Sequence, residues 1–380
     1  MIALGFAVLL VGLAVLYAVQ LLAFARGLRR VLAQPLPPLP DPLPTVSVIV
    51  PARNEAARID ACLAALTAST YPAFDVTVVD DFSDDATDER VAAWAERDGR
   101  VRLLRLVDTG LASAFGHKGA ALAAGIRASA GQYVLSTDAD CAAHPGWIEA
   151  MVRMFNAPEV GFVAGWAKMR PGRTLLGRMQ ALEFAGLVGA GAGALGAGDP
   201  NMCNSASLAY PRAVFEAFSP DQETDRSPWD DERLLHAIAA SPSYTARFCS
   251  SPEAVVVTDP EPSFAAYFRQ RRRWAALGAA YDTPGAAYTA RLTWAFNAAL
   301  LAGVALLATP HAWMAWLAAL ALKAGSEALV LVPTARHLGL GRLVVQFVPQ
   351  QLVQIPLTVA LGIATLWGQP VWKGRSFNEP

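Results

Sequence analysis

The chain contains few cysteines and histidines, the residues that form disulfide bonds in small secreted domains and bind zinc. It has 4 cysteines and 5 histidines among 380 residues, and no two cysteines stand in a C-x-x-C spacing. A disulfide framework or a structural zinc site is therefore not indicated, and a reducing compartment is compatible with this composition. The net charge of −1 shows no basic excess, so nothing indicates nucleic acid as a partner.

Charged residues are also scarce, at 17% of the chain against 54% hydrophobic residues, and they are unevenly distributed. Three long segments carry no charge at all, namely residues 1–25, 292–322 and 343–372. Because about 20 apolar residues suffice to cross a bilayer, each segment is a candidate membrane span. A turn at Thr309-Pro310-His311 divides the second segment, so the sequence predicts one N-terminal and about three C-terminal transmembrane helices.

The first apolar segment is either a cleaved signal peptide or a retained anchor. Residues 23–25 resemble a cleavage site, but no lysine or arginine precedes the apolar core. The core is also longer than the usual length of about 7–15 residues, so we expect a retained anchor. The arginines that follow, Arg26, Arg29 and Arg30, predict that the next domain is cytoplasmic in a multi-pass protein of the cell membrane.

The sequence does not determine whether, or in which direction, the last apolar segment crosses the membrane. Arg336 and Arg342 precede it, and Lys373 and Arg375 follow it. A helix that crossed here would leave one of these basic groups outside, against the usual charge bias. Either one of the predicted segments does not cross the bilayer or the chain tolerates the exception.

Between the apolar ends, strand-like runs alternate with segments predicted as helices. The runs are rich in valine, isoleucine and leucine and occupy residues 46–50, 76–79, 101–106 and 134–135. The predicted helices occupy residues 54–70, 86–95 and 118–130. This alternation predicts an α/β fold with a mostly parallel sheet, in which ligands bind at the carboxyl ends of the strands.

The composition divides the chain into five parts. They are an N-terminal transmembrane helix (1–25), a basic and proline-rich linker (26–44), a globular α/β domain (45–282), a C-terminal transmembrane region (283–372) and a short tail (373–380). The linker is typical of a stiff, extended segment.

Asp138 and Asp140 follow the fourth predicted strand in a D-x-D pattern. Side chains at i and i+2 of an extended segment share a face, and a hard divalent cation prefers oxygen ligands and often binds phosphates as well. An isolated D-x-D is more often a turn or cap. Four further motifs in a fixed order favour a metal that holds a diphosphate.

Two of these motifs are acidic. Asp80 and Asp81 end the second strand and can accept hydrogen bonds from the base or ribose of a nucleotide, whereas a neighbouring aspartate caps the next helix. Asp230 and Asp231 form the other pair. A carboxylate there is either a general base for an acceptor hydroxyl or part of a solvated acidic turn.

The remaining motifs contain basic residues. The turn after the first strand holds Arg53, and Lys118 opens a helix whose N-terminus favours phosphate. In the run Q-R-R-R-W at 270–274, Arg273 can clamp a diphosphate and Trp274 can stack on a sugar. The other arginines near this run, Arg269, Arg271 and Arg272, are expected to form a basic collar at the membrane surface.

Together these motifs resemble those of family 2 glycosyltransferases over roughly residues 46–275. The resemblance implies a GT-A fold, a nucleotide-sugar donor that is usually a UDP-sugar, Mg²⁺ or Mn²⁺, and inversion at the anomeric carbon. It implies Asp231 as the general base and Asp138 and Asp140 as metal ligands. The implied donor-binding residues are Pro51, Arg53, Glu55, Asp80, Asp81, Lys118, Asp138, Gln270, Arg273 and Trp274. The implied acceptor-side residues are Asp230, Asn204 and Trp274.

Two acceptors fit the resemblance. A lipid glycosyltransferase needs only access to a headgroup, whereas a processive polysaccharide synthase must also extrude a polymer, alone or with a small membrane partner subunit. The few predicted spans favour a lipid acceptor, and residues 372–375 resemble the tail of bacterial enzymes that glycosylate carotenoids and other lipids. An inactive scaffold on the same fold would lack motif carboxylates, and all of them are present.

Overall fold

The computed structural model describes residues 2–110, 118–218, 231–278, 283–309, 312–366, 371–372 and 375–376. They form two compact units, each assembled from segments far apart in the sequence. Unit 1 comprises Met1–Arg30, Pro171–Asn201 and Pro260–Pro370, and unit 2 comprises Val31–Arg170, Met202–Asp259 and Val371–Pro380.

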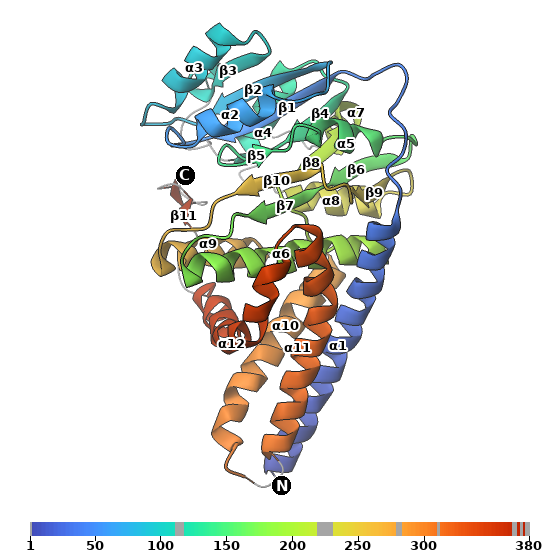
Figure 1. Cartoon of the computed structure of the whole chain (residues 1–380), viewed down its shortest axis with the longest axis vertical. Helices are drawn as coiled ribbons and strands as arrows, with labels where there is room; N and C mark the ends of the chain where they lie inside the picture. The colour runs from blue at the N-terminus through green and yellow to red at the C-terminus, as the bar shows by residue number, and fades with distance from the viewer. Residues whose placement is uncertain are drawn as a thin grey trace. The chain divides into compact units, whose positions relative to one another are not determined.

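Unit 2 is built on a seven-stranded sheet in the order β3-β2-β1-β4-β8-β6-β9 (Figure 1). The strands are β1 (Val46–Ala52), β2 (Phe74–Asp80), β3 (Val101–Arg105), β4 (Tyr133–Ser136), β6 (Val160–Ala164), β8 (Leu208–Pro211) and β9 (Thr245–Phe248). The first four are parallel to one another, and β8 runs antiparallel to both of its neighbours, β4 and β6. The predicted α/β fold with a mostly parallel sheet is confirmed.

Smaller elements complete unit 2. A three-stranded sheet has the order β5-β10-β7, from β5 (Ala142–Ala143), β10 (Val255–Thr258) and β7 (Trp166–Met169). A two-stranded ladder joins β11 (Val371–Trp372) and β12 (Arg375–Ser376). The helices are α2 (Ile59–Thr67), α3 (Thr87–Arg97), α4 (Lys118–Ala128), α5 (Trp147–Arg153), α7 (Arg212–Phe218) and α8 (Asp231–Ala240), and η1 (Leu106–Thr109) is a short 3₁₀ turn.

The sequence explains the central strand and its first crossover helix. All seven residues of β1 are buried, as expected for a parallel strand covered on both faces. The buried face of α2 consists of Ile59, Cys62, Leu63 and Leu66, at the spacing of one helical face. The helix begins at Ile59, later than predicted, because residues 54–58 form a loop that presents polar groups at the end of β1.

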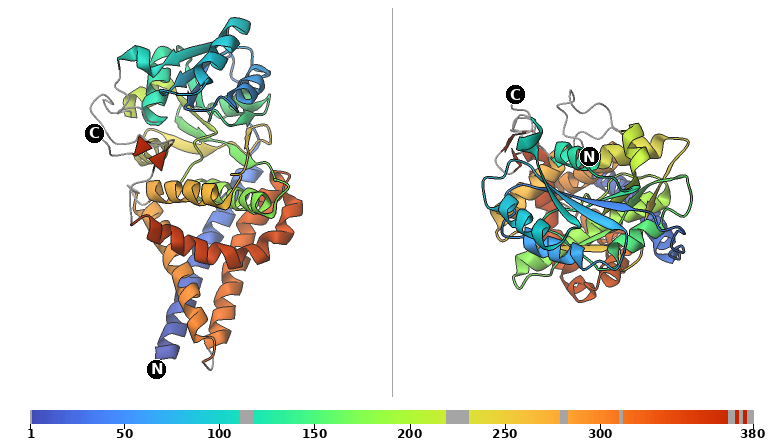
Figure 2. Two further views of the ribbon diagram at one scale, coloured as in Figure 1. Left: turned by 90° about the vertical axis from the view of Figure 1, so that its left-hand side faces the viewer. Right: turned by 90° about the horizontal axis from the view of Figure 1, so that it is seen from above.

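Unit 1 is helical. It contains α1 (Ile2–Ala33), α6 (Leu175–Ala197), α9 (Phe264–Gly278), α10 (Pro284–Gly303), α11 (Ala312–His337) and α12 (Phe347–Ala364), with the 3₁₀ turns η3 (Val304–Leu306) and η4 (Gly341–Gln346). Figures 1 and 2 show α1, α10 and α11 side by side, whereas α6, α9 and α12 lie across them. The rings of Tyr17 on α1 and Phe296 on α10 are 5.2 Å apart, which fills the space between these helices.

Three helical segments among the described residues are long and apolar enough to cross a membrane: Ala3–Ala33, Ala312–His337 and Gly341–Ala364. One lies at the N-terminus, and two rather than about three lie in the C-terminal region. The third segment contains α12, which lies across the other long helices of unit 1 (Figure 2). The long apolar segments of unit 1 are therefore not all parallel to one another.

Close helix packing in unit 1 depends on glycine. A Cβ atom on Gly193 of α6 would lie 2.4 Å from the backbone oxygen of Phe24 on α1, and one on Gly189 would lie 2.2 Å from Thr334 Oγ1 on α11. Both contacts are far shorter than van der Waals distance, so only glycine fits. The glycine-rich part of α6 is thus packed between two long helices.

The charged pair in α11 is satisfied within unit 1. Lys323 Nζ donates to Glu327 Oε1 and to Gln351 Oε1, both at 2.6 Å. Tyr17 Oη donates to the same Glu327 oxygen at 2.7 Å, and Gln351 Nε2 donates to its other oxygen at 2.8 Å. A network in which each charge has partners can be buried in an apolar bundle.

Candidate active site

Predicted site residues of unit 2 lie at the carboxyl ends of three neighbouring strands, β2, β1 and β4. β2 ends at Asp80, β1 ends immediately before Arg53, and β4 ends two residues before Asp138. Since β1 lies between β2 and β4 and neighbouring strands are about 4.8 Å apart, the ends of β2 and β4 are separated by roughly 10 Å. The strand order reverses at β1, which is where ligands bind in open α/β sheets.

Two loops at this edge are cross-linked. Arg53 Nη1 donates to the carbonyl oxygens of Asp81 at 2.6 Å and Phe82 at 2.8 Å, and the Asn54 N–H donates to Ser83 Oγ at 3.0 Å. Asn54 and Phe82 both have a φ of 53°, a left-handed conformation that is uncommon outside glycine. Such strain is concentrated at ligand sites. Arg53, predicted to bind the donor, here fixes the loop that presents the paired aspartates after β2.

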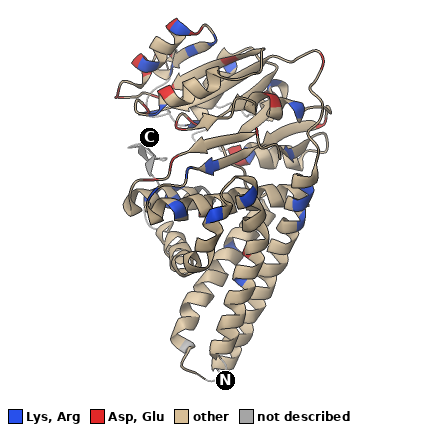
Figure 3. Ribbon diagram, viewed as in Figure 1, with Lys and Arg blue, Asp and Glu red and all other residues tan. Residues whose placement is uncertain are grey.

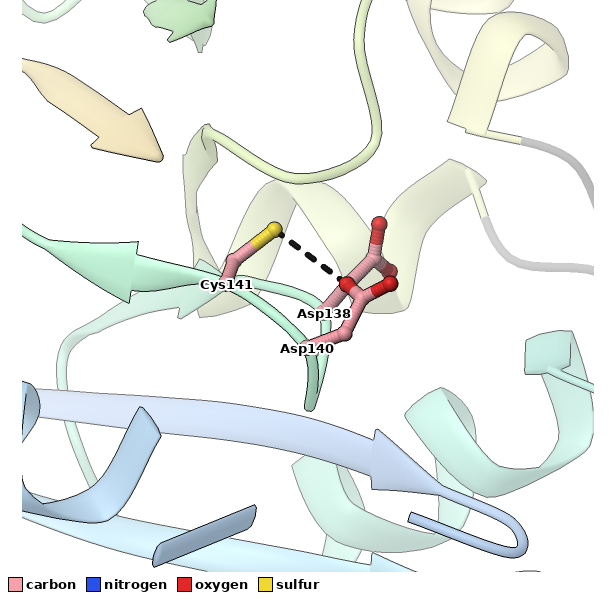
Figure 4. A group of neighbouring side chains, drawn as sticks. All are labelled: Asp138, Asp140 and Cys141. Carbon is pink, nitrogen blue, oxygen red and sulfur yellow. Dashed lines mark hydrogen bonds between the residues drawn. The ribbon is translucent and has the colours of Figure 1, made fainter. Parts of the chain in front are cut away.

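Asp138 and Asp140 lie side by side after β4 (Figure 4). Each is paired with a basic side chain, since Lys118 Nζ donates to Asp138 Oδ1 and Arg58 Nη1 donates to Asp140 Oδ2 at 3.3 Å. Lys118 opens α4, as predicted. The sequence did not single out Arg58, which also pairs with Glu55 at 3.1 Å. A divalent cation binding here would therefore displace side-chain cations already in place.

Cys141 is a third potential metal ligand, which the sequence motifs did not predict. Its thiol donates to Asp140 Oδ1 at 3.4 Å, and its Sγ and one oxygen from each aspartate lie within 4.8 Å of one another (Figure 4). The only sequence signal was its place directly after the D-x-D. Paired carboxylate oxygens suit Mg²⁺ or Mn²⁺, and a sulfur ligand suits softer ions. The residues present thus fit the predicted divalent cation at Asp138 and Asp140.

Burial and charge tune the groups around the D-x-D. Burial raises the pKa of Asp140, and the Asp138 carboxylate adds to the shift, although Arg58 and Lys118 oppose it. Burial lowers the pKa of Lys118, but the carboxylates of Asp138 and Asp231 outweigh it and raise the pKa overall. Lys118 therefore stays protonated at neutral pH. Asp231 and Asp138 of the D-x-D thus act on the same lysine.

Asp80 carries an acceptor that nothing in the described part of the chain satisfies. Its side chain is buried, and its Oδ2 accepts a hydrogen bond from the Ser83 N–H at 3.2 Å. Its Oδ1 is buried without a hydrogen-bond partner among the described residues. Burial raises the pKa of Asp80, and the hydrogen bonds from Ser83 partly offset the shift. An unmet buried acceptor costs about 1–3 kcal/mol, so Asp80 is suited to an N–H or hydroxyl donor on a ligand.

Asp80→Asn is expected to stabilise the free protein and to weaken nucleotide binding. Since the folded state raises the pKa of Asp80, the ionised carboxylate destabilises the fold near neutral pH. This penalty fades as the pH falls through the raised pKa, so the advantage of asparagine should shrink with it. Thermal unfolding near pH 7 and near pH 5, with UDP titration at neutral pH, measures both effects. A variant less stable than the parent near pH 7 would contradict the expectation.

The predicted base and acceptor-side residues are only partly described. Asp231 is the first residue of α8 and its side chain is buried. Trp229 and Asp230, the latter predicted on the acceptor side, lie outside the described residues. Asn204 lies in the turn before β8, and its Oδ1 accepts a hydrogen bond from the Ala206 N–H at 2.9 Å. This side chain therefore shapes its own turn.

The Q-x-x-R-W residues Gln270, Arg273 and Trp274 lie on α9 and belong to unit 1. One prediction about this run is wrong. Arg271 was expected in an exposed basic collar, but its side chain is 3% exposed and its Nη2 lies 3.0 Å from Glu183 Oε2. The reason is that α6 supplies a buried carboxylate, which the spacing within α9 could not reveal.

A mostly parallel sheet with carboxylates and a D-x-D at its ligand-binding edge is the arrangement expected of a nucleotide-sugar glycosyltransferase. The model for Glycosyl transferase family 2 matches residues 47–206, and that for Glycosyl transferase family group 2 matches residues 133–328, just over half of the chain. The chain therefore belongs to the family 2 glycosyltransferases, which confirms the resemblance seen in its motifs.

Relatives share parts of this chain. An N-acetylglucosaminyltransferase of Mesorhizobium japonicum is 30% identical over 248 residues, which are 63% of this chain and 57% of that one. Glycosyltransferase AglE of Haloferax volcanii is 34% identical over 125 residues, 32% of this chain and 39% of that one. The poly-beta-1,6-N-acetyl-D-glucosamine synthase of Staphylococcus aureus is 24% identical over 248 residues, 63% of this chain and 55% of that one. The matched part thus spans under two thirds of each relative.

A solved structure shares the fold over nearly the whole chain. The mannosyltransferase PcManGT from Pyrobaculum calidifontis, in complex with GDP-Man and Mn²⁺, aligns with a TM-score of 0.59 and 22% identity. The alignment covers 95% of this chain and 99% of that chain. At this identity the similarity concerns the fold, including helices outside the sheet domain.

Proposed function

We propose that the chain is an inverting glycosyltransferase that moves a sugar from a nucleotide-sugar donor to a lipid-type acceptor in the membrane. One observation carries the proposal: Asp80 ends one strand, and Asp138 and Asp140 follow another, at the ligand-binding edge of one mostly parallel sheet. Asp138 of the D-x-D and Asp231 both act electrostatically on Lys118. The family supplies the reaction class, and these residues supply the groups that the reaction needs.

Each group has a distinct task in the proposed mechanism. Asp231 takes the proton from the acceptor hydroxyl, whose oxygen attacks C1 of the sugar opposite the diphosphate and inverts that centre. Asp80 and Asp81 hold the nucleoside, and the protonated Lys118 offers its charge to the diphosphate. A divalent cation, Mg²⁺ or Mn²⁺, held by Asp138 and Asp140 would supply further positive charge to the leaving diphosphate. Gln270, Arg273 and Trp274 keep their predicted role in donor binding.

The interior of unit 1 supports a lipid acceptor over a polymer that is extruded. A translocated glycan needs a path lined by water or sugar-binding groups. Between α1, α10 and α11 lie the rings of Tyr17 and Phe296, tilted by 47° to one another, and the fully buried side chain of Lys323. The staphylococcal relative, a poly-beta-1,6-N-acetyl-D-glucosamine synthase, favours the second candidate, a processive polysaccharide synthase, which would then need a small membrane partner subunit.

Charge placement supports a cytoplasmic catalytic unit on the cell membrane. In unit 1, basic residues gather where α6 and α9 lie across the bundle, and most of the length of α1, α10 and α11 carries no charge (Figure 3). Arg26, Arg29 and Arg30 are exposed at the end of α1. Basic residues flank spans on the cytoplasmic side, so we propose that unit 2, which continues from α1, is cytoplasmic.

Labelled donors distinguish the two acceptor classes. Membranes containing the full chain are incubated with Mn²⁺ and with labelled UDP-glucose, UDP-N-acetylglucosamine or GDP-mannose, and then extracted with organic solvent. We expect label from one donor in the lipid extract, with membranes carrying Asp140→Ala as the blank. Label confined to large, solvent-insoluble polymer would support the synthase instead, and no incorporation from any donor would contradict both candidates.

A further inference from the structure

A cluster of charged and aromatic side chains joins α6 and α9 in unit 1. On α9, Tyr267, Arg271 and Trp274 follow at i, i+4 and i+7, which places them on one face of the helix. On α6, Glu183 and Phe184 meet this face. The cluster lies outside the aspartate site of unit 2, but it includes the tryptophan of the Q-x-x-R-W run.

Glu183 is the hub of the cluster. Its Oε2 accepts hydrogen bonds from Tyr267 Oη at 2.5 Å and from Arg271 Nε and Nη2 at 3.1 and 3.0 Å. The side chains of Arg271 and Glu183 are 3% and 11% exposed. A buried guanidinium needs a partner of opposite charge, because removing that partner leaves an uncompensated charge in an apolar site. Glu183 thus determines where the Arg271 guanidinium lies.

The guanidinium in turn holds the indole. Its carbon lies 4.2 Å from the centre of the Trp274 ring and 5.1 Å from that of the Tyr267 ring, so it is packed against both π faces. Phe184 supports the indole from α6, with ring centres 5.8 Å apart. Trp274 therefore has few rotamers open to it. Its orientation depends on Glu183, a carboxylate on another helix that lies 88 residues before Arg271 in the chain.

The neighbouring Gln270 is fixed by the same pair of helices. Its Nε2 donates to Glu261 Oε1 at 3.0 Å. The backbone of Glu261 is held by the fully buried Gln180 of α6, which accepts from the Glu261 N–H at 2.9 Å and donates to the Glu261 carbonyl oxygen at 3.0 Å. Two members of the Q-x-x-R-W run are thus oriented by α6.

We propose that Glu183 and Arg271 are positioning residues for sugar transfer, which orient Trp274 for its contact with the substrates. The inference rests on the proposed role of Trp274 in transfer. A preorganised side chain binds without losing rotamer freedom at that moment, and small misplacements of a binding group are costly to the rate. Glu183 and Arg271 need not touch the substrates for this effect.

A double-mutant cycle tests the proposal. Glu183→Gln is expected to lower kcat/KM for the most active labelled donor by roughly 10–100-fold. In a Trp274→Leu background the same change should cost less than about twofold, because the indole on which it acts is gone. Arg269→Gln, at an exposed position of α9, is the matched control and should leave kcat/KM unchanged in both backgrounds. Equal losses from Glu183→Gln in both backgrounds would overturn the proposal.

Two further measurements test the proposal if Glu183→Gln folds poorly or if no transfer assay is found. Tyr267→Phe removes one hydrogen bond to Glu183 but keeps the ion pair, and it should show the same background dependence with a smaller loss. Fluorine NMR of the full chain labelled with 5-fluorotryptophan reports the indole without any substrate. Tyr267→Phe or Glu183→Gln should shift or broaden the resonance that Trp274→Phe removes, and an unmoved resonance would overturn the proposal.

These readouts separate the inference from the proposed function. If Trp274→Leu leaves transfer unchanged, the predicted role of Trp274 is wrong, whatever Glu183 does. If Trp274→Leu impairs transfer but Glu183→Gln does not, the positioning role is wrong and the proposed function stands.

Discussion

Replacing Asp140 by alanine is expected to lower sugar transfer by about 10²–10³-fold while the protein stays folded. Asp140 lies beside Asp138 after β4, and their oxygens, together with Cys141, can surround one cation (Figure 4). Without Asp140 the cation loses a ligand and the leaving diphosphate loses much of its charge stabilisation. The fold should tolerate the change, because burial raises the pKa of Asp140 and its ionised form gains little from the site. Initial rates with the active donor, and thermal unfolding of the same preparation, measure both effects.

A matched control separates this effect from a general loss of charge. Asp60→Ala also removes a carboxylate from unit 2, at a half-exposed position of α2 that pairs with Arg90 at 2.5 Å. Exposed pairs contribute about 0–1 kcal/mol, so transfer should stay within about twofold of the parent. Full activity of Asp140→Ala would remove the metal assignment and leave the family assignment intact.

Asp231→Asn is expected to lower kcat by about 10²–10⁴-fold, the usual contribution of a general base. Asparagine keeps the shape of the side chain at the start of α8 but cannot accept the acceptor proton. Nucleotide binding should remain within a few-fold of the parent, because the nucleoside and diphosphate contacts are assigned to other residues. Steady-state kinetics together with nucleotide titration distinguish a loss of turnover from a loss of binding.

Glu232→Gln provides the control at the neighbouring position. It removes the same charge one residue along α8, where a side chain points in a different direction. We expect near-parental turnover from this variant. Retained turnover in Asp231→Asn would reject Asp231 as the base, and equal losses in both variants would indicate a general effect of negative charge near α8.

Local patterns were sufficient to predict the sheet edge in unit 2. The apolar runs at 46–50 and 134–135 correspond to β1 and β4, and the polar residues directly after them lie at the expected carboxyl ends. The reason is that a buried parallel strand needs a short run of β-branched residues, which the sequence shows directly. The alternation of strands and helices was therefore enough to predict Asp80 and Asp138 at one edge of the sheet.

Contacts between distant segments were not predictable in the same way. Arg271 was misplaced at the surface because its partner Glu183 lies 88 residues earlier in the chain. Arg58 was missed because it lies in the loop before α2, where no periodic pattern singles it out. Both side chains are placed by packing between elements, and a single sequence without an alignment carries little information about such pairs.

The direction of α12 relative to the other helices of unit 1 was likewise not predictable from hydropathy. Residues 343–366 have the length and apolarity of a span, and the charges on either side left two alternatives. The helix lies across α10, where a Cβ on Gly362 would meet the Trp294 ring at 2.2 Å, and Gln350 Nε2 donates to the Met179 carbonyl oxygen of α6 at 3.1 Å. These contacts decide its direction, and composition does not encode them.

Metal-dependent nucleotide binding by the purified full chain tests the central claim most directly. UDP and GDP are titrated calorimetrically into the parent and into Asp138→Asn/Asp140→Asn, with Mn²⁺ and after its removal by a chelator. We expect the parent to bind one of the nucleotides at least about 10-fold more tightly with Mn²⁺, and the double variant to lose that gain. Binding that is equally tight without metal, or equally metal-dependent in the double variant, would contradict a nucleotide-sugar site built around these two aspartates.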